Sequence, residues 1–225
     1  MLKKVIAIGD SFFAGAELHD ATSVWPCLYA NEIGVEFHNR SRGGCGSKWV
    51  LKELLSSIYN EHEPCLYILL WPHLSRRDYY DKDSEDWYTL GPIAHTYKGK
   101  YQDSIESVRK HYFADMHSFL DDKIQNLCMI HHALLALQQT KHQWVMHISD
   151  HEIYETTWFQ DDPVKLLQDQ TVWAITTFED DLNFVDWSKK HGCHLGEYGH
   201  PLEDAHRLAF EFFKPKYDLV TRSMM

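Results

Sequence analysis

Uninterrupted apolar runs alternate along this chain with stretches in which apolar residues recur at helical spacing. Such runs predict buried strands, and the spaced patterns predict helices packed against them. We expect strands at residues 3–8, 35–38, 65–71 and 144–148, with a further short strand near 183–186. We expect helices at residues 23–33, 48–59, 104–139 (as one long helix or a pair), 164–170 and from Pro201 to Phe213.

This alternation predicts a parallel sheet with helices on both faces. The pattern breaks at 72–103, where charged, aromatic and turn-forming residues mix, and again over the acidic stretch 150–182. A chain of 225 residues suits one domain, so we interpret 1–225 as a single domain with two insertions. In sheets of this kind the active site lies beyond the carboxyl ends of the strands, which directs attention to the residues that follow each strand.

Charge and cysteine content narrow the class of protein. A formal net charge of −11 disfavours nucleic acid as the main partner. No apolar segment approaches the roughly 20 residues that span a bilayer, and the first apolar run is too short for a cleavable signal. Five cysteines without paired spacing are typical of free thiols in a reducing compartment. We therefore expect a cytoplasmic protein, of an oligomeric state that the sequence leaves open.

A candidate nucleophile follows the first strand, in Gly9-Asp10-Ser11. A serine on a tight turn after a buried strand exposes its hydroxyl and leaves its amide free to donate, although ordinary turns also use these residues. The second strand leads into a glycine-rich loop that contains Gly43 and Gly44. Glycines let backbone amides approach a bound oxyanion closely. Each segment alone is weak evidence, because ordinary turns and flexible loops have the same composition.

A candidate base lies before the last helix, in Glu197-Tyr-Gly-His200-Pro201. The proline holds the histidine on a rigid turn, and the carboxylate three residues earlier could fix its tautomer. The chain has 16 histidines, so His200 could also be a simple helix cap. His206 competes for the role, because it too lies three residues after a glutamate, Glu203.

These motifs, in this order, resemble the SGNH/GDSL hydrolase superfamily, which has Gly-Asp-Ser near the N-terminus and Asp-x-x-His-Pro before the last helix. The resemblance implies a three-layer α/β/α fold with a flavodoxin-like parallel sheet. It also implies Ser11 as nucleophile and His200 as base, with Glu197 in place of the usual aspartate. The amides of Ser11 and Gly44 would be oxyanion donors, with Gly43 the alternative to Gly44.

The sequence departs from the family after the third strand. Where the family has Gly-x-Asn-Asp, this chain has Trp71-Pro-His73 followed by Leu-Ser-Arg76-Arg77. His73 stands where the family's oxyanion-binding asparagine belongs, so it is the first choice for the third donor. Arg76 or Arg77 would be a cationic substitute.

The resemblance implies a serine esterase that cleaves a small acyl ester, including O-acetyl groups on carbohydrates, through an acyl-enzyme and without cofactor or metal. The altered third segment motivates an alternative from another class, a catalytically impaired binding or structural module that keeps the fold. Metal-dependent chemistry on His194, Glu197 and His200 is disfavoured, because their spacing does not match the i, i+4 pair of a helical zinc site.

Overall fold

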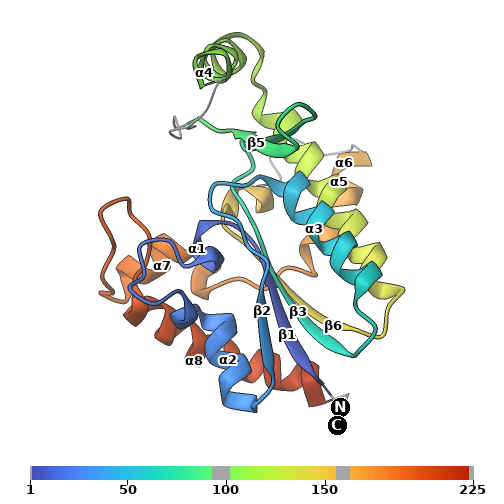
Figure 1. The fold of residues 1–225 in the computed structure, drawn as a ribbon, viewed down its shortest axis with the longest axis vertical. Helices are drawn as coiled ribbons and strands as arrows, with labels where there is room; N and C mark the ends of the chain where they lie inside the picture. The colour runs from blue at the N-terminus through green and yellow to red at the C-terminus, as the bar shows by residue number, and fades with distance from the viewer. Residues whose placement is uncertain (1, 93–101, 156–162, 223–225) are drawn as a thin grey trace.

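A four-stranded parallel sheet, in the order β2-β1-β3-β6, forms the centre of the molecule (Figure 1). The computed structural model describes residues 2–92, 102–155 and 163–222. All seven residues of β3 are buried, which explains why this central strand reads as a continuous apolar run. Four of the five expected strands are confirmed within one residue at each end; they are β1 (Lys4–Ile8), β2 (Glu36–Asn39), β3 (Cys65–Trp71) and β6 (Gln143–Ile148).

Helices cover both faces of the sheet, so the three-layer α/β/α prediction is confirmed (Figure 1). Alternate strand residues supply the two cores: Ile6 and Ile8 face one layer, and Val5 and Ala7 face the other. The first layer contains α3 (Ser47–Asn60), α5 (Phe119–Gln138) and α6 (Pro163–Val172), and the second contains α1 (Ser11–Ala14), α2 (Trp25–Ile33), α7 (Phe184–Lys190) and α8 (Glu203–Arg222).

A series of hydrogen bonds links buried polar groups in the core under α8. The Trp25 indole donates to the hydroxyl of Tyr217 (2.9 Å), which contacts Nε2 of His147 (2.8 Å), and Nδ1 of that imidazole contacts the carbonyl of Thr176 (2.9 Å). Complete burial lowers the pKa of His147 to about 3. A neutral ring with its proton on Nδ1 satisfies every one of these bonds.

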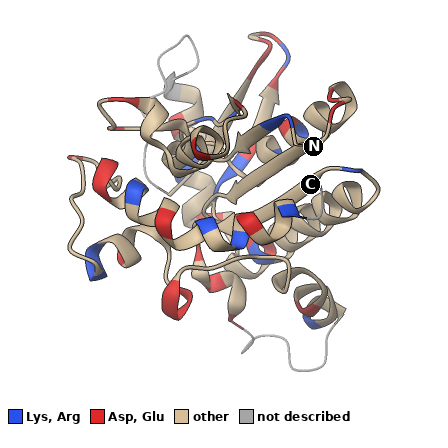
Figure 2. Cartoon of the chain, turned by 90° about the horizontal axis from the view of Figure 1, so that it is seen from below, with Lys and Arg blue, Asp and Glu red and all other residues tan. Residues whose placement is uncertain are grey.

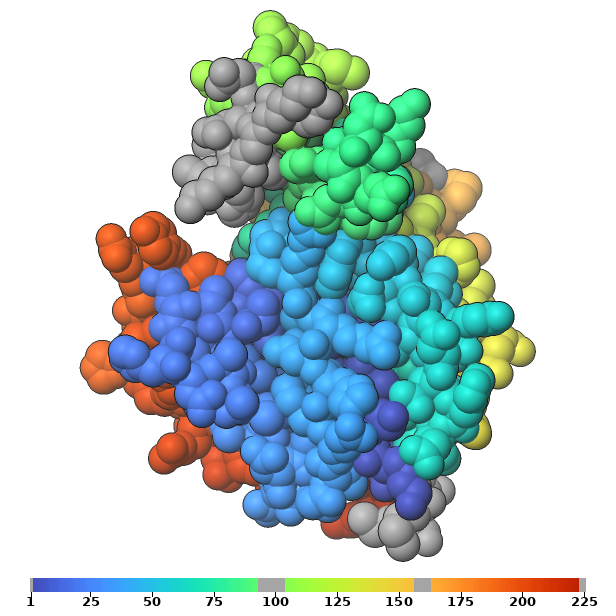
Figure 3. Space-filling view, viewed as in Figure 1, coloured from blue at the N-terminus to red at the C-terminus, as the bar shows by residue number. Residues whose placement is uncertain are grey.

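The insertion after β3 contains an antiparallel hairpin that the sequence pattern did not reveal. Its strands, β4 (Arg77–Asp81) and β5 (Asp86–Leu90), lie beyond the carboxyl ends of the sheet (Figure 1). The carboxylate of Asp78 accepts hydrogen bonds from the amides of Gly46 (2.7 Å) and Trp49 (2.8 Å), which caps α3. Figure 3 shows the hairpin, in green, resting on the light-blue segment that leads into α3.

Two further predictions from the sequence concern residues 104–139 and 183–186. Residues 104–139 form a helix pair, α4 (Gln102–His111) and α5, joined by a π-helical turn η2 (Tyr112–Met116). The strand expected near 183–186 is wrong, because Asn183 accepts a hydrogen bond from the Asp186 amide (2.9 Å) and so caps α7. Short 3₁₀ turns complete the described elements: η1 (Ala21–Ser23), η3 (His151–Tyr154) and η4 (Glu179–Asp181).

Candidate active site

Ser11 begins helix α1 at the carboxyl end of the central strand β1. Asp10 caps this short helix, accepting a hydrogen bond from the Phe12 amide on Oδ1 (3.1 Å). Gly9 fits because a Cβ there would lie only 2.9 Å from the Cβ of Leu70 on β3. Ser11 is only 8% exposed, so this residue is buried, whereas the sequence predicted an exposed hydroxyl.

The glycine-rich loop runs beside the end of β1. The amide of Arg42 donates to the carbonyl of Gly9 (3.0 Å), which fixes the loop next to the serine turn. A Cβ on Gly43 would lie 3.9 Å from the Cβ of Ser11, so this glycine faces the serine directly. Gly44 follows with a φ of 74°, a conformation that favours glycine. The loop therefore brings backbone of the expected kind to Ser11, with both glycines still candidates for the donor.

His200 lies in a closed turn between α7 and α8. The Gly196 amide donates to the carbonyl of His200 (2.8 Å), and the Gly199 amide donates to the carbonyl of Gly196 (3.0 Å). The imidazole packs edge-on against Phe12, with 5.6 Å between ring centroids. This contact brings the expected base beside the residue that follows Ser11, although the two are far apart in the sequence.

A carboxylate that sequence analysis missed, Glu17, contacts the imidazole of His200. Its Oε2 lies 2.6 Å from Nδ1 and also accepts the amide of His200 (3.1 Å), while Oε1 accepts the amide of Tyr198 (2.8 Å). Burial raises the pKa of Glu17, but these hydrogen bonds and the nearby imidazole outweigh it, so the pKa lies below its ordinary value. No local spacing signals this contact.

The carboxylate at His200 Nδ1 is therefore Glu17, in the place where Glu197 was expected. Glu197 is exposed, at a central position of the turn from Gly196 to Gly199, where side chains project into solvent. Nδ1 makes one hydrogen bond, and Glu17 occupies it.

The competing histidine, His206, is a core residue. It is 1% exposed, and its ring packs against Trp25 and Phe184. Burial lowers its pKa to about 3. An enclosed, neutral imidazole without access to a substrate is unsuited to act as a general base.

The segment after β3 brings Arg76, rather than His73, to the serine turn. Arg76 Nη1 donates to Oδ2 of Asp10 (3.1 Å) and to the carbonyl of Cys45 (3.3 Å). The His73 side chain is 44% exposed, and its Nδ1 lies 3.8 Å from Oδ2 of Asp150. Arg77 turns away from the site and binds Asp121 and Asp122 of α5.

The hydroxyl of Ser11 and the imidazole of His200, both within the described residues, are not hydrogen-bonded to each other. The two segments meet through the ring of Phe12 instead. Catalytic hydrogen bonds are often long in the absence of substrate and tighten when it binds. The arrangement thus brings a serine, a histidine held by a carboxylate and a glycine loop to one edge of the sheet.

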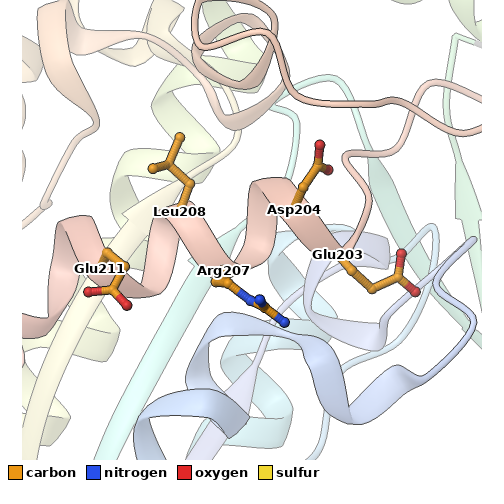
Figure 4. A pocket seen from close by; sticks show the side chains of 5 residues that line it. All are labelled: Glu203, Asp204, Arg207, Leu208 and Glu211. Carbon is orange, nitrogen blue, oxygen red and sulfur yellow. The ribbon is translucent and has the colours of Figure 1, made fainter.

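The other surface features involve neither Ser11 nor His200. A shallow hollow on α8 is lined by residues such as Arg207 and Leu208, whose side chains point to different sides of the helix (Figure 4). Acidic and basic residues are interspersed along the chain (Figure 2).

Among the described residues, no three or more His, Cys, Asp and Glu side chains gather as a metal ion requires, and His194 pairs with Asp204 (2.8 Å). No described helix has the length and apolarity to cross a membrane.

The fold matches that of SGNH hydrolases in comparisons with solved structures. A member of the lipolytic protein G-D-S-L family from Veillonella parvula aligns over 95% of this chain and 97% of its own, with a TM-score of 0.52 and 14% identity. A carbohydrate esterase family 2 enzyme with a carbohydrate-binding domain, from Corynascus thermopiles (Myceliophthora fergusii), aligns over 97% of this chain and 66% of its own, with a TM-score of 0.50 and 12% identity.

A two-domain esterase active on acetylated mannans also aligns, over 97% of this chain and 49% of its own, with a TM-score of 0.50 and 9% identity. No family model and no curated protein matches the sequence. At these identities the comparisons establish the fold.

Proposed function

We propose that this protein is a serine esterase with Ser11 as nucleophile and His200 as general base. The observation that supports this most strongly is the setting of His200. Its Nδ1 lies 2.6 Å from Oε2 of Glu17, and its ring contacts Phe12, the residue next to Ser11. A serine beside a histidine that is itself oriented by a third group is the arrangement that activates a hydroxyl for acyl transfer.

The reaction then follows from the chemistry of these groups. His200 Nε2 takes the proton of the Ser11 hydroxyl as the oxygen attacks the ester carbonyl. The tetrahedral intermediate collapses to an acyl-enzyme, and the imidazolium gives its proton to the departing alcohol. Water, deprotonated by the same imidazole, attacks the acyl-enzyme; the imidazolium then returns the proton to the departing Ser11 oxygen, which releases the carboxylic acid.

The oxyanion would be stabilised by the amides of Ser11 and of Gly44 or Gly43, with Arg76 as the third donor. Arg76 is the residue of the altered segment that reaches both Asp10 and the glycine loop. We propose Arg76 over His73, our first choice from position in the sequence, because His73 is directed to Asp150. A cationic donor would partly compensate for the missing asparagine.

Small acyl esters, including O-acetyl groups on carbohydrates, are the substrate class we propose. Support comes from the fold shared with a carbohydrate esterase and with an esterase active on acetylated mannans. Tyr79 and Tyr80 on the hairpin, each about half exposed, add flat surfaces of the kind that stack on sugars.

The test is steady-state hydrolysis of p-nitrophenyl esters of increasing chain length, and of acetylated mannan, by wild type, Ser11→Ala, His200→Ala and the double variant. Both single variants should lose nearly all activity and the double variant should be no worse, because triad members act as a unit. Ser104→Ala, an exposed serine on α4, is the matched control and should retain full activity. A wild type that binds acetylated sugars without turnover would instead support the binding-module alternative.

A further inference from the structure

We propose that Glu17 is the carboxylate that positions His200 for catalysis, supplied by the segment that carries the nucleophile rather than by the residue three places before the histidine. The proposal rests on the proposed esterase function and extends it to a residue that no motif identifies. Glu17 lies six positions after Ser11, and 183 positions separate it from His200.

The first observation is the backbone of Glu17. Its φ is 65°, in the left-handed region, where a residue with a side chain is strained. Gly15, also left-handed, caps the C-terminus of helix α1, and the Leu18 amide donates back to the Gly15 carbonyl (3.2 Å). This turn holds Glu17 in a strained backbone conformation, which is stable only because contacts with the surrounding residues offset the strain.

The turn at residues 196–200, which carries His200, binds the Glu17 carboxylate through several hydrogen bonds. Glu17 accepts three hydrogen bonds from two residues of the turn, one from Tyr198 and two from His200. A Cβ on Gly196 would lie 2.5 Å from Glu17 Oε1, so glycine at this position leaves the room that the carboxylate fills. The turn and the carboxylate are thus fitted to each other on both sides.

The third observation is that neighbouring carboxylates have other partners. Glu203 Oε1 accepts the amide of His19 (2.7 Å), and Asp204 pairs with His194. Glu197 is exposed. The Glu17 carboxylate contacts the imidazole of His200.

These contacts determine the protonation of the imidazole. A carboxylate at Nδ1 accepts a hydrogen bond, so Nδ1 carries the proton and Nε2 keeps the lone pair that a general base requires. The same carboxylate stabilises the imidazolium that forms as Ser11 reacts. Nucleophile and positioning residue therefore lie on one short segment.

The test compares Glu17→Gln and Glu17→Asp with Glu197→Gln as the matched control. Glu17→Gln should lower kcat by about 10³–10⁴-fold with little change in KM, because the amide keeps the shape and loses the charge. Glu17→Asp should restore part of kcat, and Glu197→Gln should leave the kinetics unchanged.

A 15N NMR measurement of the His200 ring nitrogens, assigned by their loss in His200→Gln, separates this proposal from the proposed function. The tautomer with its proton on Nδ1 should dominate in wild type and in Glu197→Gln and should be lost in Glu17→Gln, whether or not the protein hydrolyses esters. An unchanged tautomer in Glu17→Gln would overturn the role of Glu17. A changed tautomer in a protein without ester turnover would overturn the esterase proposal alone.

Discussion

Arg76 Nη1 lies 3.1 Å from Oδ2 of Asp10, the fully buried carboxylate that precedes Ser11. The same atom contacts the carbonyl of Cys45 in the glycine loop (3.3 Å). This arginine therefore joins the two segments that would hold the oxyanion, from a part of the chain where the resemblance to SGNH hydrolases fails. Its position makes it both a structural partner of Asp10 and a candidate donor.

Arg76→Ala should lower kcat/KM by about 10²-fold, the usual cost of losing one oxyanion donor. It should also lower the free energy of unfolding by about 3 kcal/mol, because the Asp10 carboxylate is left buried without its cation. Enzyme kinetics on a common ester and urea unfolding measure the two effects separately. Arg76→Lys keeps the charge and should recover most of the stability and less of the activity, because a lysine lacks the planar fork.

His73→Ala is the matched comparison for Arg76→Ala. Because His73 is largely directed to Asp150, its loss should change kcat/KM by less than about tenfold. A larger loss in His73→Ala than in Arg76→Ala would restore His73 as the third donor and contradict the choice of Arg76.

Gly196→Ala tests the fit between the histidine turn and Glu17 without touching either charged group. The added methyl group would lie 2.5 Å from Oε1, so the carboxylate must move away from Nδ1, and we expect kcat to fall by about tenfold or more. Gly192→Ala is the control. Its φ of 72° makes alanine cost about 1 kcal/mol of stability, but the methyl group would meet nothing within 4 Å and kcat should not change. Equal kcat in both variants would argue against a fitted carboxylate.

The buried histidines predict a loss of stability in mild acid. The pKa of His147 and of His206 is about 3 in the folded protein and near 6.5 in the unfolded chain. Between these values only the unfolded chain takes up protons. The contribution is therefore fully present above pH 6.5 and is lost as pH falls towards 3, at up to about 1.4 kcal/mol per pH unit for each ring.

His206→Leu should reduce that slope by one ring's share, as measured by urea unfolding between about pH 7 and 5. His206 Nδ1 is buried without a hydrogen-bond partner among the described residues, so an apolar replacement of similar volume should cost little at neutral pH. A slope identical to that of wild type would mean that His206 is not held neutral in the fold.

Much of the fold could be predicted because the central strands are buried on both faces. Most of β1 and all of β3 are short continuous apolar runs that end at turn-forming residues, the pattern of a strand buried on both faces. The hairpin was missed because its strands carry charged residues that act outside the sheet: Asp78 caps α3, and Arg77 binds α5. The strand expected near 183–186 was wrong because Asn183 caps a helix whose first residues are apolar. Over so few residues, an apolar run at the start of a helix cannot be distinguished from a short strand.

The candidate site divides in the same way. Ser11 and His200 lie in local motifs, so order and spacing were enough to single them out. Glu17 lies in no motif, and its contact with His200 exists only because the fold brings α1 to the turn before α8. Local spacing favoured Glu197 instead, but a position at the tip of a tight turn places that residue in solvent.

The most direct test of the account is covalent labelling with a fluorophosphonate, which reacts with activated serines, followed by peptide mass spectrometry. We predict a single adduct on Ser11 in wild type, no adduct in Ser11→Ala, greatly slowed labelling in His200→Ala and unchanged labelling in Ser104→Ala. Wild-type protein that leaves Ser11 unlabelled, or labels it as fast after His200 is removed, would contradict the assignment of Ser11 and His200 as nucleophile and base.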